Sequence, residues 1–284
     1  MANIRLIRRR IRSVQNTAKI TKAMEMVAAS KMRRAQERGL AGRPYDEKIR
    51  QVLADLAAQR TPEYVPPLLE KREVHRIGVV HITPDRGLCG GLIANINRRL
   101  ASFLLEQTVP VQIVAVGRKG RSFALRTGLD LRAEFTGLGD RPSLADTLPI
   151  SHLICQDYTY GHFDLVYLSY TQFISTLAQR PVMRQILPIE PAQLPPMQNV
   201  EYIYEPDPMG VLDQLLPRFV EMQVYHALLE SIASEQSARM VAMRNATDNA
   251  NELLADLTLT LNKARQEMIT KELLDITGGA VALE

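Results

Sequence analysis

The longest regular pattern in the sequence lies in its C-terminal third, from about residue 208 to residue 280. Apolar residues recur there at alternating intervals of three and four, from Leu212 to Met268, and no proline or glycine occurs between residues 218 and 277. Three positions of this stripe are polar: His226, Gln236 and Thr247. Such a stripe is typical of a helix packed along a partner helix. We expect one helix roughly 100 Å long at about 1.5 Å rise per residue, too long for the interior of an ordinary globular domain.

The N-terminal segment carries a related pattern. The first apolar positions with this spacing are Ile4, Ile7, Ile11, Val14 and Ala18. The apolar face then shifts to Ile20, Met24, Val27, Ala28 and Met32. This shift predicts a stutter, which is a local change of supercoil. Residues 39–44 (GLAGRP) predict a weak point, but the pattern resumes at Ile49, so we expect a single helix that ends near Arg60.

Between these helices the pattern changes to short β-branched runs that alternate with helical spacing. The expected strands are 75–83, 109–117, 130–136, 164–173 and 182–187, with a further candidate at 200–204. The expected helices are 92–105, 118–126 and 143–158. This alternation predicts a Rossmann-like α/β domain. The predicted organisation is a discontinuous helical shaft, 1–60 with 208–284, and an inserted α/β domain with its linkers, 61–207.

Because both long helices flank the inserted domain, their simplest packing is an antiparallel two-helix coiled coil. If Leu56 lies beside Leu212, an equal rise places Ile4 near Ala264. Residues 268–284 then extend past the N-terminus without a partner in the same chain. Much of this tip is apolar, so we expect it to contact another protein.

Charge is distributed unevenly along the chain. Residues 1–50 contain fourteen Lys and Arg against four Asp and Glu, whereas residues 207–284 contain six against twelve. Opposite charge favours packing of the two helical ends. The alternative, nucleic-acid binding by the basic end, is weakened because no aromatic residue that could stack on bases precedes Tyr45.

Other features exclude several classes of protein. No apolar run is long enough for a transmembrane span, and no apolar region typical of a secretory signal follows the basic start. The two cysteines, Cys89 and Cys155, are far apart, which indicates a reducing compartment without a disulfide framework.

Residues 85–91 (DRGLCGG) are the strongest candidate for a chemical site. Their glycines could cradle a phosphate at a helix N-terminus, but the motif is neither GxGxxG nor a P-loop, and a tight turn between a strand and a helix explains it as well. The histidines lack metal-ligand spacing. We therefore expect no catalytic residue, metal or cofactor, and keep a nucleotide-binding enzyme as the alternative.

Five segments resemble the γ subunit of F-type ATP synthases. They are SVQNTAKITKAMEMVAASKMRRAQ (13–36), DRGLCGGLIANI (85–96), YEPDP (204–208), SEQSARMVAMRNATDNA (234–250) and NKARQEMITKELLDITGGA (262–280). The likeness spans the whole chain. It implies the bacterial type, since no chloroplast or cyanobacterial insertion and no closely spaced cysteine pair is present.

The resemblance also implies a role and partners. Such γ subunits form a central rotor stalk inside a ring of three α and three β subunits, which carry the nucleotide sites. Their α/β domain contacts the ε subunit and the membrane c ring. They couple ion flow to conformational cycling of the β subunits, or the reverse during ATP hydrolysis, and have no active site. The implied location is the cytoplasmic face of the bacterial plasma membrane, as a peripheral protein.

The resemblance implies contact residues where motifs match. Those implied to contact or couple to β subunits are Met24, Arg265, Gln266, Arg8, Arg9, Thr270 and Glu272. Those implied to contact the c ring are Tyr202 and Glu205.

Overall fold

The computed structural model of the chain describes residues 4–58, 65–190 and 207–281. The chain divides into two compact units, which are described in turn. The N- and C-terminal unit combines residues 1–28 with residues 239–284, and the central unit comprises residues 29–238.

Two long helices run through both units, as predicted. Helix α1 spans Ile4–Ala58 and helix α5 spans Pro208–Val281, which is 74 residues. Asp207 begins α5, because its carboxylate accepts a hydrogen bond from the Gly210 N–H at 2.8 Å and Pro208 follows as the first helical residue. Aspartate before a first-turn proline is a favourable start for a helix.

In the N- and C-terminal unit, α1 and α5 form an antiparallel pair in the predicted register. The hydroxyls of Thr21 and Thr247 lie 2.7 Å apart, and these residue numbers add to 268, as do those of the predicted pair Leu56 and Leu212. The buried positions of the seam keep the three-four spacing on both helices. They include Ile7, Ala18, Thr21, Glu25 and Ala28 on α1, and Met240, Met243, Thr247 and Ala250 on α5.

The predicted stutter in α1 is wrong. Ile20 and Val27, which the shifted face would bury, are 59% and 53% exposed. The seam instead continues without a shift through Thr21 and Glu25, which are both buried. These polar residues can occupy the seam because each finds a hydrogen-bonding partner on α5.

In the central unit, α1 continues as one helix through Gly39 and Pro44, as expected. Gly42 occupies a seam position, and a Cβ added to it would come within 2.7 Å of the His226 imidazole. Glycine therefore makes room for a large polar side chain on α5 rather than breaking α1. Arg50 adds a cross-helix link, since it donates to Gln223 at 2.9 Å and lies over the Phe219 ring.

The same unit contains a five-stranded sheet in the order β3-β2-β1-β4-β5. The strands are β1 (Ile77–Ile82), β2 (Val111–Val116), β3 (Asp130–Phe135), β4 (Leu165–Phe173) and β5 (Gln179–Leu187). The first four strands are parallel, and β5 pairs antiparallel with β4. The further strand expected at 200–204 lies outside the described residues.

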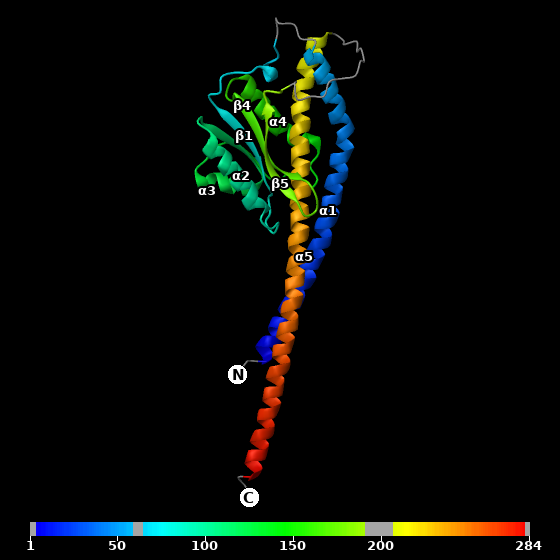
Figure 1. The fold of residues 1–284 in the computed structure, drawn as a ribbon, viewed down its shortest axis with the longest axis vertical. Helices are drawn as coiled ribbons and strands as arrows, with labels where there is room; N and C mark the ends of the chain where they lie inside the picture. Colours follow the sequence, from blue (N-terminus) through cyan, green and yellow to red (C-terminus); the bar gives the residue numbers. More distant parts are fainter. Residues whose placement is uncertain (1–3, 59–64, 191–206, 282–284) are drawn as a thin grey trace. The chain divides into compact units, whose positions relative to one another are not determined.

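Helices cover both faces of the sheet (Figure 1). The elements beside the strands are η1 (Pro67–Leu69), α2 (Leu92–Glu106), α3 (Arg118–Thr127) and α4 (Leu144–Thr159). On one face, residues of α2 pack with Val79 and Ile113. On the other, α4 and the long helices share a core with Val80 and Val114. This arrangement confirms a Rossmann-like α/β domain inserted between two long helices.

The hairpin of β4 and β5 is tied directly to α5. Ser234 donates to the carbonyl of Thr171 at 3.0 Å, and Ser237 donates to the carbonyl of Thr176 at 2.7 Å. Both serines are buried. The sheet and the long helix are thus joined by hydrogen bonds as well as by apolar packing. Within the described ranges, no helix is sufficiently long and apolar to cross a membrane.

Candidate partner-contact surface

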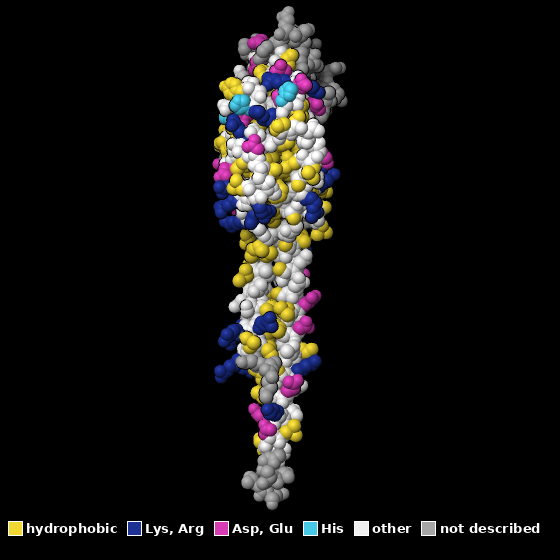
Figure 2. All heavy atoms as spheres, turned by 90° about the vertical axis from the view of Figure 1, so that its left-hand side faces the viewer, with side chains coloured by type: hydrophobic (Ala, Val, Ile, Leu, Met, Phe, Trp, Pro, Cys, Tyr) yellow, Lys and Arg dark blue, Asp and Glu magenta, His cyan; other side chains and the backbone are white. Residues whose placement is uncertain are grey.

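The first turns of α1 present a basic surface. Arg8 and Arg9 are both exposed, and neither forms a salt bridge with another residue in the described part of the chain. Figure 2 shows basic and hydrophobic side chains close together on the two-helix part of the visible face. Exposed guanidinium groups of this kind are available to acidic groups on another protein.

Met24 lies on the side of α1 next to the seam. It is half-buried, whereas Ile20 and Val27, which neighbour it on the helix surface, are exposed. The three side chains form a short apolar stripe, here called the outer stripe of α1. These are three of the five residues that the sequence pattern assigned to the shifted face. Ile20 and Val27 are turned toward the surface, whereas Ala28 of the same predicted face is buried.

The C-terminal part of α5 loses its partner gradually, as the predicted register requires. Leu261 and Ala264 are half-buried, and Met268 is already 47% exposed. Beyond it the exposed large apolar side chains are Ile269, Leu273, Leu274 and Ile276. The unpartnered apolar tip is therefore confirmed for the residues that the structure describes up to Thr277.

The predicted contact residues of α5 are exposed on this same stretch. They are Arg265, Gln266, Thr270 and Glu272. Gln266 and Thr270 line one shallow groove of about 440 Å³ with Lys263 and Lys271. Arg265 and Glu272 are seven residues apart, so they project from one side of the helix. Their assignment to β-subunit contacts stays a prediction, as it does for Met24, Arg8 and Arg9.

Sequence reasoning missed an ion pair across the two helices in which only the carboxylate is buried. The Glu25 side chain is 8% exposed and accepts hydrogen bonds from Lys22 of its own helix and from Arg244 of α5, both at 3.0 Å. The hydrogen bond from Lys22 lowers the pKa of Glu25, burial opposes it, and Arg244 adds to the lowering. The unbroken three-four spacing through Thr21 and Glu25 was the signal that could have identified these seam positions.

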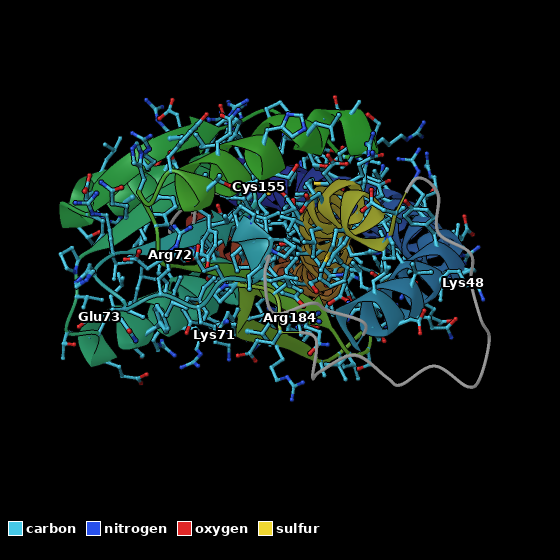
Figure 3. The ribbon with its side chains drawn as sticks, turned by 90° about the horizontal axis from the view of Figure 1, so that it is seen from above. Lys48, Lys71, Arg72, Glu73, Cys155 and Arg184 are labelled. Carbon is cyan, nitrogen blue, oxygen red and sulfur yellow. The ribbon has the colours of Figure 1, made fainter. Side chains whose placement is uncertain are left out.

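At one end of the α/β domain, charged side chains crowd before the first strand (Figure 3). Arg72 donates to the Glu70 carboxylate at 2.7 Å and to the Tyr158 carbonyl at 3.0 Å, and Lys71 pairs with Glu190 at 3.1 Å. The predicted c-ring residues, Tyr202 and Glu205, lie outside the described residues. Their assignment also stays a prediction.

Asp85 ties the DRGLCGG segment to the start of α3 and to the loop after β3. The Asp85 carboxylate accepts the N–H of Arg118, the first residue of α3, at 2.9 Å and the N–H of Gly137 at 3.1 Å. Thr83 accepts the next available amide, from Gly120, at 2.7 Å. These bonds close the N-terminus of α3, whereas the glycines of the segment precede α2, whose N-cap is Gly91 without a side-chain cap. The positive φ of Leu88 and Gly90 is typical of a tight turn between a strand and a helix, and nucleotide binding stays the alternative.

Burial shifts the pKa of two side chains of the α/β domain, His81 and Cys155. His81 is fully buried, where its ring nitrogens lie 3.0 Å from Ser169 and Asn97, and burial lowers its pKa to about 4. Burial also raises the pKa of Cys155 to about 12, and Cys89 is buried. Among the described residues, no group of three or more His, Cys, Asp or Glu side chains could hold a metal ion.

Comparison with known proteins identifies the family. The model of the ATP synthase family matches residues 3–283. The chain is 66% identical over 284 residues to an ATP synthase gamma chain of Dehalococcoides mccartyi, with all of both chains covered. It is 52% identical over 287 residues to the gamma chain of Roseiflexus sp., covering 100% of this chain and 99% of the relative.

Solved structures agree with the fold. The central stalk and c-ring structure of the Tetrahymena thermophila mitochondrial ATP synthase matches with a TM-score of 0.62 and 26% identity, covering 80% of this chain and 99% of that one. A chain of the Euglena gracilis mitochondrial ATP synthase matches with a TM-score of 0.66 over 99% of this chain and 94% of its own; at 20% identity it supports the fold alone. The chain therefore belongs to the ATP synthase family, alongside the gamma chains that it matches from end to end.

Proposed function

We propose that the chain is the γ subunit of an F-type ATP synthase and forms its central rotor stalk. Its identity of 66% to a gamma chain over the full length of both proteins carries this proposal. In this role the chain couples ion flow through the membrane c ring to conformational cycling of the catalytic β subunits. During ATP hydrolysis it transmits rotation in the opposite direction.

The described helices suit a rotor. A shaft must resist bending, and α5 contains no proline between residues 218 and 281 that would remove a backbone hydrogen bond. A shaft must also turn inside its bearing. Exposed arginines such as Arg8 and Arg265 can make and release solvated ion pairs, each worth about 0–1 kcal/mol. An asymmetric shaft then presents a different face to each of three identical β subunits and shifts their conformational equilibria.

The chain itself supplies no chemistry in this mechanism. The nucleotide sites belong to the α and β subunits. The α/β domain instead contacts the ε subunit and the c ring. The protein is accordingly peripheral to the membrane, on the cytoplasmic face of the bacterial plasma membrane.

We propose that function divides the chain into a shaft, 1–60 with 208–284, and an α/β domain, 61–207. The boundaries of the two compact units differ from this functional division. Residues 29–58 and 208–238 of the long helices belong to the central unit, because they pack with the sheet. The β-contact residues of the shaft would be Met24, Arg8, Arg9, Arg265, Gln266, Thr270 and Glu272. The residues of the α/β domain that contact the c ring would be Tyr202 and Glu205.

The direct test is assembly. The chain should purify with a complex of α and β subunits that hydrolyses ATP, and the complex should lose its ATP-driven proton pumping when the chain is omitted from reconstitution. A chain that forms no complex with these subunits, or that binds ATP in the micromolar range by itself, would contradict the rotor assignment.

The proposed β contacts are tested by replacing Arg265 and Gln266 together with alanine. ATP turnover or torque of the assembled complex should fall, because two exposed hydrogen-bonding groups of the shaft are lost. Alanine at the exposed neighbours Asn251 and Glu252 is the matched control on the same helix. Turnover equal to that of the control would remove Arg265 and Gln266 from the contact set.

Met24→Lys tests the outer stripe. A lysine there would add a charge beside an acidic β-subunit loop and should lower the number of protons pumped per ATP hydrolysed. Asn16→Lys places the same charge at an exposed position of α1 and serves as the control. Normal pumping by the Met24→Lys complex would show that Met24 does not contribute to coupling.

A further inference from the structure

Helix α1 of the N- and C-terminal unit has two faces that could pack against α5. One contains Ala18, Thr21, Glu25 and Ala28, and is buried. The other is the outer stripe of Ile20, Met24 and Val27, displaced by one residue, which is about 100° around the helix. The outer stripe is the more apolar, so the hydrophobic effect alone favours burying it. The structure buries the more polar face, and something other than apolar burial must select it.

Two cross-helix contacts account for this choice. The Thr21 and Thr247 hydroxyls lie 2.7 Å apart in a buried layer, and Thr247 is also within 2.9 Å of the Met243 carbonyl. One turn away, Arg244 donates to the buried Glu25 carboxylate at 3.0 Å. A rotation of α1 by 100° would break both contacts.

We propose that Thr21 and Glu25, through Thr247 and Arg244, form an orientation lock that turns the outer stripe of α1 toward the β subunits. In this proposal Met24 makes the contact with the β subunit. Thr21 and Glu25 do not touch the β subunit and act as positioning residues that orient Met24. The proposal rests on the proposed function only in naming the β subunits as the partner. The lock itself is a property of the chain.

The lock lies in the unit that contains no part of the sheet. In the central unit, buried residues of α1 such as Leu53 and Leu56 pack in one core with the sheet and α4. In the N- and C-terminal unit, the described residues belong to α1 and α5 alone. A buried polar pair is a known means of fixing orientation and register in a two-helix seam, at some cost in stability.

The lock predicts that the solvent accessibility of α1 side chains changes when Arg244 and Thr247, its two residues on α5, are replaced. Single cysteine probes are placed at Ile20, Val27 and, as the seam probe, Ala28, after replacement of Cys89 and Cys155 by alanine. In the parent chain, maleimide should label positions 20 and 27 rapidly and position 28 slowly. In Arg244→Ala with Thr247→Val, labelling at 20 and 27 should slow and labelling at 28 should accelerate.

The expected shift in the orientation equilibrium is up to about tenfold, because a hydrogen bond to a charged group contributes about that factor and solvent screening at the half-exposed Arg244 reduces it. Arg244→Lys keeps the positive charge and should restore the parent labelling pattern. Lys263→Ala removes a charge from an exposed position of the same helix and should leave the pattern unchanged. Unchanged labelling at 20 and 27 in a variant of native helical content would overturn the lock.

If the double variant loses helical content, Arg244→Gln provides the test, because it removes the charge but keeps an amide donor. Slower labelling at 20 and 27 in this variant supports the lock, and parent labelling overturns it. In the reconstituted complex, Arg244→Ala should also lower proton pumping per ATP, with recovery in Arg244→Lys. Altered labelling with normal pumping would support the lock and would show that the outer stripe does not contribute to coupling. The orientation lock and the coupling role of the outer stripe can therefore fail separately.

Discussion

The two units hold the same pair of helices together by different physical means. In the central unit, apolar side chains of α1 and α5 share a core with the sheet, and Leu53, Leu56 and Val220 are almost fully buried. In the N- and C-terminal unit, the seam consists of small, apolar and polar residues, and Thr21 and Glu25 take positions usually given to leucine. Burial is extensive where a sheet covers the helices. Cross-helix hydrogen bonds matter most where the helices stand alone.

This comparison predicts that the largest losses of stability come from the central unit. Gly117 has a φ of +94°, and a Cβ there would lie 1.9 Å from the Thr83 carbonyl oxygen. Gly117→Ala should lower the free energy of unfolding by more than about 3 kcal/mol, because backbone must move. Urea denaturation followed by circular dichroism measures the effect.

Gly137→Ala is the matched control, since its φ is +80° and no atom lies within 4 Å of the added Cβ. It should cost about 1–2 kcal/mol for backbone strain alone. Equal losses for the two variants would show that the contact with Thr83 is not the cause.

Acid should also act mainly on the central unit. The pKa of His81 is lowered from 6.5 to about 4 by burial, so the unfolded chain takes up a proton below pH 6.5 that the folded chain takes up only near pH 4. Stability should therefore fall by about 3 kcal/mol as the pH drops through this window. His81→Asn should flatten this part of the profile. His75→Gln, at a highly exposed position, should leave the slope as it is.

In the N- and C-terminal unit the expected effect is smaller and local. Thr247→Val removes the hydroxyl that bonds to Thr21, and its shape is nearly conserved, so the loss should be about 1 kcal/mol. Amide hydrogen exchange should accelerate near residues 18–25 and remain unchanged in the sheet. Faster exchange throughout the sheet would mean that the two units unfold together, contrary to the division drawn here.

The smallest effect on stability is expected at the exposed end of α5. Thr270→Ala with Glu272→Ala alters two exposed side chains beyond the paired seam, so the melting temperature of the isolated chain should stay within error. ATP hydrolysis by the complex should nevertheless decrease if these residues contact a β subunit. A fall in melting temperature would indicate an intramolecular role instead.

The sequence alone was sufficient for much of the fold. The three-four spacing from Leu212 to Ala264 predicted α5 and its buried stripe, and counting from Leu56 and Leu212 predicted the register that Thr21 and Thr247 confirm. The strand and helix alternation predicted the α/β domain. These features are periodic, and periodicity is visible in a single sequence.

Only the tertiary structure showed why the more polar face of α1 is the buried one. Ile20, Met24 and Val27 look like seam residues in isolation, because their apolar surface suggests burial, yet Thr21 and Glu25 occupy the seam. Their partners, Thr247 and Arg244, are more than 200 residues away in sequence. Whether a polar side chain can be buried depends on a partner brought to it by folding, and local pattern does not reveal that partner.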